Sequence, residues 1–127
     1  MTVSESVRQQ QGWPLHAAVT CVGDWDSTSY TNAPHCLRTL AEGKHYPEDV
    51  RGEVHADGEI WSQALWDIRS PLGARTADRV IIAAQFDFAP NTSFAAAADA
   101  TVRTAQRLVG AGAARQVRAA FAARGLL

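Results

Sequence analysis

One histidine, His55, combines a reactive side chain with several nearby carboxylates. These acidic residues lie within seven positions of it, at Glu48, Asp49, Glu53 and Asp57. A carboxylate that accepts a hydrogen bond from one ring nitrogen orients the other nitrogen and favours the imidazolium form. Such an imidazole could donate a hydrogen bond to an oxygen on which negative charge develops. The alternative is a solvated loop histidine, because His55 lies two residues before the expected N-cap of a helix.

The other histidines and the cysteines form no metal-binding pattern. They are His16, His35, His45, Cys21 and Cys36. No two histidines have the i, i+4 spacing of a helical zinc site, and no H-E-x-x-H motif is present. The cysteines could form a disulfide in an oxidising compartment, but two cysteines alone leave the pairing open. We therefore expect no metal site made from this chain alone.

The composition limits the class of protein. The 127 residues correspond to one domain, and 12 basic against 13 acidic side chains give no basic surface for nucleic acid. No apolar run approaches the length of a membrane span. The first twenty residues also lack the apolar core of a signal peptide. Either the protein is cytoplasmic or this chain lacks its original N-terminus.

The elements that must position His55 are mostly helices. Residues 1–19 show no periodicity and are expected to be poorly ordered, and a helical domain is expected over residues 20–127. Its first part is rich in turn residues, with one short strand expected at 29–31 and a strand or a single helical turn at 36–40. Four helices are expected at 58–70, 76–86, 94–109 and 113–124.

Apolar spacing and capping residues support these helices. In the first helix, residues at helical spacing form one apolar face: Ile60, Trp61, Ala64, Leu65 and Ile68. Asp57 is the expected N-cap, and Pro71 is expected to end the helix. Residues 80–82 could form a buried strand, but helix is favoured because helices flank them. The chain is therefore expected to be mainly α, an irregular N-terminal region followed by about four packed helices.

Two segments resemble the C-terminal lobe of fungalysin-type zinc metallopeptidases, which are relatives of thermolysin. They are Gly-Glu-Val-His-Ala-Asp-Gly-Glu-Ile-Trp at 52–61 and Ala-Leu-Trp-Asp-Ile-Arg at 64–69. Segments upstream and at the end of the last helix are also similar, at 24–30, 34–38, 46–49 and 120–126. The likeness covers residues 20–127 and leaves 1–19 unmatched.

The resemblance implies roles for individual residues. In such peptidases, an N-terminal lobe carries the zinc on an H-E-x-x-H helix, zinc polarises the scissile carbonyl, and the motif glutamate activates water. The resemblance gives His55 the role of stabilising the oxyanion from the C-terminal lobe. Asp49, with Glu48 as the alternative, would orient this histidine. Arg38 would bind a carbonyl of the peptide substrate.

The chain departs from the family pattern because it has no H-E-x-x-H motif and no motif for the third zinc ligand. We therefore expect it to be inactive unless another polypeptide supplies the missing N-terminal lobe, and to self-associate through an uncovered apolar face. The alternatives are a non-enzymatic helical domain that binds peptides or proteins, and a small zinc-binding regulator. The family is usually secreted. Substrate preference stays open, as does the choice between a fragment, half of a split enzyme and a free-standing domain.

Overall fold

The computed structural model describes residues 18–24, 26–33 and 35–127. The predicted disorder of residues 1–19 lies outside this range, except at its last two residues. The chain divides into two compact units, which we call the N-terminal unit (Met1–Glu42) and the helical unit (Gly43–Leu127). Since this boundary lies within residues 20–127, the single domain expected there stays a prediction.

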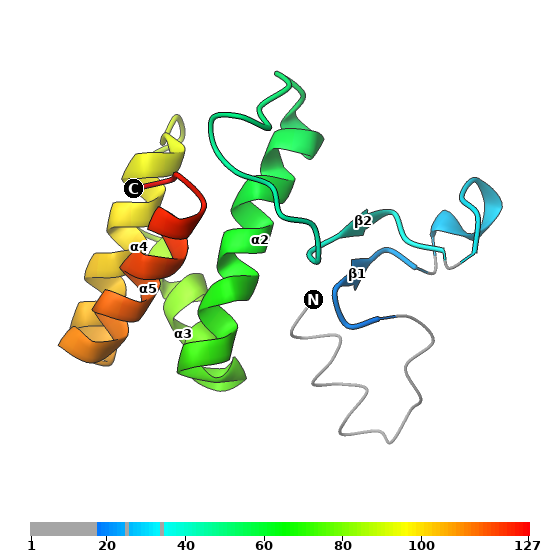
Figure 1. Ribbon diagram of the computed structural model, residues 1–127. Helices are drawn as coiled ribbons and strands as arrows, with labels where there is room; N and C mark the ends of the chain where they lie inside the picture. The colour runs from blue at the N-terminus through cyan, green and yellow to red at the C-terminus, as the bar shows by residue number, and fades with distance from the viewer. Residues whose placement is uncertain (1–17, 25, 34) are drawn as a thin grey trace. The chain divides into compact units, whose positions relative to one another are not determined.

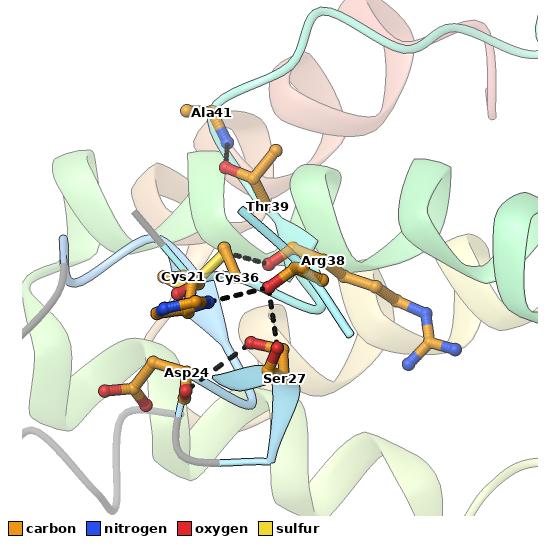
Figure 2. The surroundings of a disulfide bond; sticks show 9 residues. Cys21, Asp24, Ser27, Cys36, Arg38, Thr39 and Ala41 are labelled. Carbon is orange, nitrogen blue, oxygen red and sulfur yellow. Dashed lines mark hydrogen bonds between the residues drawn. A yellow bond between two sulfur atoms is a disulfide. The ribbon is translucent and has the colours of Figure 1, made fainter. Parts of the chain in front are cut away.

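A short antiparallel ladder lies in the N-terminal unit. Strand β1 (Cys21–Val22) pairs with β2 (Arg38–Thr39), so that Cys21 faces Thr39 and Val22 faces Arg38. The strand alternative for residues 36–40 is thus confirmed. A disulfide joins Cys21 to Cys36 and settles the pairing that the sequence left open (Figure 2).

The prediction of a short strand at residues 29–31 is wrong. Residues Ser27–Ser29 form a 3-10 helix, η1. The carbonyl oxygen of Ser27 accepts hydrogen bonds from the amides of Tyr30, at 3.3 Å, and Thr31, at 3.0 Å. The Thr31 hydroxyl donates to the same oxygen at 2.7 Å. These local bonds close a turn, and side chains that bond nearby backbone in this way compete with strand pairing.

Four α-helices form the described part of the helical unit, which confirms the mainly α fold (Figure 1). They are α2 (Val54–Leu72), α3 (Ala74–Gln85), α4 (Phe94–Leu108) and α5 (Ala111–Ala123). Helix α2 packs on α3 and α5, and α4 packs on the same two helices. The run at residues 80–82 lies within α3, as expected.

Helix α2 differs from its predicted bounds at both ends. It begins four residues earlier because the Glu53 carboxylate, rather than Asp57, caps the first amides. It also continues through Pro71 to Leu72. Proline has no amide hydrogen to donate within the helix. The turn beyond it is still closed by a hydrogen bond from the amide of Gly73 to the Arg69 carbonyl at 2.9 Å.

An aromatic stack marks the core of the helical unit. The Trp61 ring of α2 stacks on Phe121 at 5.0 Å between ring centroids and on Phe94 at 5.9 Å. Phe88 contacts the same indole edge-on at 6.2 Å. Trp61 and Phe94 pack against a buried core that includes alanines from all four helices, and these small residues allow the helices to approach closely. None of the helices in the described residues is both long and apolar enough to cross a bilayer.

Candidate functional site

His55 lies in the first turn of α2, not in the loop where it was expected. Glu53 accepts hydrogen bonds from the amides of His55, at 3.0 Å, and Ala56, at 2.8 Å. Asp57 reaches back and accepts from the amides of Arg51, at 2.7 Å, and Gly52, at 3.0 Å. Both carboxylates lie at the positive end of the helix dipole, where negative charge is favourable. The backbone that carries His55 is therefore fixed on both sides of the residue.

The imidazole of His55 is exposed, so a ligand in solvent can reach it. Within residues 18–24, 26–33 and 35–127, no side chain or backbone group forms a hydrogen bond with this ring. Two of the nearby carboxylates instead bind backbone amides at the start of the helix. The arrangement offers an accessible hydrogen-bond donor on a rigid backbone.

Asp49, the expected orienting residue, is half-buried in the turn before α2. Its carboxylate accepts a hydrogen bond from the amide of His45 at 2.7 Å, and its own amide donates to the His45 carbonyl at 3.0 Å. We call residues 45–49 the His45–Asp49 turn. No hydrogen bond links Asp49 to the His55 ring among the described residues, and Glu48, the alternative, is exposed. The orienting role stays a prediction.

Arg38, the expected carbonyl-binding residue, belongs to strand β2 of the N-terminal unit. Its guanidinium extends away from the disulfide in Figure 2. The carbonyl oxygen of Arg38 lies 2.8 Å from the Cys36 sulfur, and its backbone is paired with Val22. His55 and Asp49 thus share the helical unit, while the backbone of Arg38 is fixed by a separate unit.

A surface hollow of about 460 Å³ lies beside the His45–Asp49 turn. Its lining combines this turn with the end of the last helix: His45, Tyr46, Glu48, Asp49, Ala122, Ala123 and Gly125. Asp49 is the one candidate residue that borders the hollow among the described residues. In the sequence, His45 was a candidate only as a metal ligand, and its pairing with Asp49 was not predicted.

A polar network beneath this turn was also missed, and we call it the Arg124 network. Arg124 donates through Nε to Asp67 at 2.7 Å and through Nη1 to Gln63 Oε1 at 2.8 Å. Its Nη1 also donates to the carbonyl oxygen of Lys44 at 3.0 Å. The signal in the sequence is Gln63, a polar residue next to Ala64 on the apolar face of α2, and it is fully buried. A buried amide needs hydrogen-bond partners.

The described residues do not supply a zinc site. Across residues 18–24, 26–33 and 35–127, no three histidine, cysteine, aspartate or glutamate side chains gather closely enough to hold a metal ion. Both cysteines are joined in the disulfide. The donors that this part of the chain offers therefore do not fit the tetrahedral zinc site of a peptidase.

Comparison with known proteins identifies the family. No curated protein and no solved structure matches the chain. The family model described as "thermolysin metallopeptidase, alpha-helical domain" matches residues 24–126. This range includes the exposed histidine, the turn before α2 and all four helices. The chain therefore belongs to the thermolysin metallopeptidase family, of which it contains the α-helical domain.

Proposed function

We propose that this chain provides the oxyanion-stabilising half of a peptide-hydrolysing site, with His55 as the donor. The observation that carries the proposal is the exposed imidazole in the first turn of α2, within the matched domain. When water attacks a peptide carbonyl, negative charge develops on the carbonyl oxygen. A donor held in place before the reaction stabilises that charge without a reorganisation cost.

Two further residues assist His55 in this proposal. Asp49 orients the imidazole through a bound water, because its carboxylate lies in the turn just before α2 and is held by the His45 amide. Arg38 donates to a second carbonyl of the peptide substrate, for which a guanidinium fork is suited. Both roles are supported by the family resemblance of the segments around these residues.

The rest of the reaction requires groups from another lobe. The described residues form no metal-binding set, so we assign no step to a metal in this chain. The zinc and the base that activates water belong to the catalytic lobe, which we propose as the partner of the helical unit. The Cys21–Cys36 disulfide supports a location in an oxidising compartment, where such bonds persist.

The first experiment tests whether the chain is incomplete. The purified 127-residue protein is incubated with casein, with and without zinc, and with a chelator. We expect no hydrolysis above the buffer control under any of these conditions. Chelator-sensitive hydrolysis by the pure chain would refute the proposal that the metal and the base come from another lobe.

The second experiment tests His55 itself. The chain is mixed with a separately expressed thermolysin-type catalytic lobe that carries H-E-x-x-H, and peptide hydrolysis is measured. We expect His55→Ala to lower kcat by about 100-fold to 1,000-fold, as for loss of one oxyanion donor. Gln106→Ala, an exposed polar change on α4, is the matched control and should leave kcat unchanged. Peptide binding that does not depend on His55, without hydrolysis, would favour a non-enzymatic binding domain.

A further inference from the structure

Arg124, at the end of α5, is bonded to the backbone on both sides of His45. Its Nη1 donates to the carbonyl oxygen of Lys44 at 3.0 Å, and its own carbonyl accepts from the amide of Tyr46 at 2.9 Å. The side chain of Arg124 is only 12% exposed, so the bond from its Nη1 is largely shielded from competing water. The backbone of residues 44–46 is thus tied to a residue about eighty positions later in the chain.

Other contacts hold the same segment in place. Gln63 Oε1 accepts from the amide of Lys44 at 3.0 Å as well as from Arg124 Nη1 at 2.8 Å. The Lys44 ammonium forms an ion pair with Glu59 of α2. The Tyr46 ring packs edge-on against Phe94 of α4, at 5.9 Å between centroids. The side chains of Arg124 and Gln63 both bind the backbone of this segment directly.

The amide of His45, between the two anchored residues, is the group that holds Asp49. It donates to Asp49 Oδ2 at 2.7 Å, and the amide of Asp49 returns a bond to the His45 carbonyl at 3.0 Å. The amide of His45 shares a peptide plane with the Lys44 carbonyl, and the His45 carbonyl shares one with the amide of Tyr46. Anchoring those planes therefore fixes the position of the Asp49 carboxylate.

We propose that Arg124 is a positioning residue, which sets the Asp49 carboxylate through the backbone of His45. This inference rests on the proposed function, in which Asp49 orients His55. Arg124 touches neither substrate nor the reacting atoms in this scheme. A planar guanidinium suits the task because it donates simultaneously to Asp67, Gln63 and the Lys44 carbonyl. A lysine ammonium is a single point charge and cannot reproduce this fork.

The test is amide hydrogen exchange in the isolated chain, followed residue by residue with NMR. In Arg124→Met, we expect the amides of Lys44 and His45 to exchange at least about tenfold faster. Gln63, the acceptor for Lys44, loses the guanidinium that holds it, and the Lys44–His45 peptide plane loses its anchor. In Arg124→Lys, the exchange rates of these two amides should lie between those of the unaltered protein and those of Arg124→Met. The control is Arg118→Met on the same helix, which removes only an exposed ion pair with Asp99 and should leave both amides unchanged.

A double mutant distinguishes positioning from a general loss of stability. In an Asp49→Ala background, the His45 amide has already lost its acceptor, so Arg124→Met should add little to its exchange rate. If Arg124→Met and Asp49→Ala speed exchange of the His45 amide additively, the inference is overturned. Equal exchange rates of this amide in Arg124→Met and Arg118→Met would also overturn it. If Arg124→Met also speeds exchange at the core amides of α4, the protein is generally destabilised. Arg124→Lys then replaces Arg124→Met, and its effect on the His45 amide is compared with and without Asp49→Ala.

Peptide hydrolysis in the mixture with a catalytic lobe supplies the link to function. Arg124→Lys should lower kcat and leave KM nearly unchanged, and the loss should be smaller when Asp49 is already alanine. If His55→Ala lowers kcat and Arg124→Lys does not, the positioning role of Arg124 is refuted and the proposed function is not. If His55→Ala leaves kcat unchanged while the Arg124 variants alter amide exchange, the proposed function is refuted. The structural link between Arg124 and Asp49 would then still hold.

Discussion

Replacing Gly125 with alanine tests the contact between the end of α5 and the His45–Asp49 turn. Gly125 has a φ of +71°, a left-handed conformation that costs an L-residue about 1–2 kcal/mol. A Cβ at this position would overlap the carbonyl oxygen of Tyr46 and lie 3.1 Å from its carbonyl carbon. Both atoms belong to the backbone, so no side-chain rotation relieves the clash.

The two effects should add. Relieving such overpacking costs about 1–3 kcal/mol, so we expect Gly125→Ala to lower the free energy of unfolding by about 2–5 kcal/mol. The assay is urea denaturation, followed by helical circular dichroism and by tryptophan fluorescence from the Trp61 stack. Hydrogen exchange at the amide of Tyr46 should also accelerate, because its bond to Arg124 breaks when the turn shifts.

Two other glycines separate the causes. Gly52 has a φ of +75°, but no atom lies within 4 Å of the place that a Cβ would take, so Gly52→Ala should show the conformational cost alone, about 1–2 kcal/mol. Gly112 lies inside α5 with equally open space, and Gly112→Ala should stabilise the protein by about 0.5–1 kcal/mol. Equal losses for Gly125→Ala and Gly52→Ala would refute the clash with Tyr46.

Reduction of the Cys21–Cys36 bond should unfold the N-terminal unit, because a disulfide that closes a loop of this length contributes about 3 kcal/mol to the free energy of unfolding. The helical circular dichroism signal should persist. Loss of the helical signal as well would contradict this prediction. Ser93→Ala should destabilise α4 by about 1 kcal/mol in thermal denaturation, because Ser93 caps that helix. The hydrogen bond from Tyr30 to Asp26, with desolvation, raises the pKa of Tyr30; Asp26→Asn should lower that pKa in a phenolate absorbance titration.

The helices were predictable because apolar spacing and capping residues act locally. Ser93, directly before the helix expected at 94–109, caps α4 and accepts a hydrogen bond from the amide of Ala96 at 3.2 Å. The start of α2 was not predicted, because both Glu53 and Asp57 can bind helix amides. The structure uses Glu53 as the cap and turns Asp57 towards the preceding loop.

The candidate site was predictable only in part, for a different reason. The resemblance of residues around His55 to relatives of thermolysin was visible in the sequence, and membership of the thermolysin metallopeptidase family is confirmed. The Arg124 network was not visible, because its members lie far apart in sequence and are brought together only by tertiary packing. Gln63 is the exception, since a glutamine among the apolar residues of a helix indicates a buried hydrogen-bond network.

The link between Arg124 and the Lys44 carbonyl spans eighty residues of chain. During synthesis, the segment that carries Asp49 leaves the ribosome long before the arginine that anchors it. Contacts between such distant residues form late in folding, after local helices. A nascent chain stalled before residue 124 would therefore carry most of its helical structure and still lack an anchored His45–Asp49 turn. Completion of α5 is the event that assembles this part of the surface.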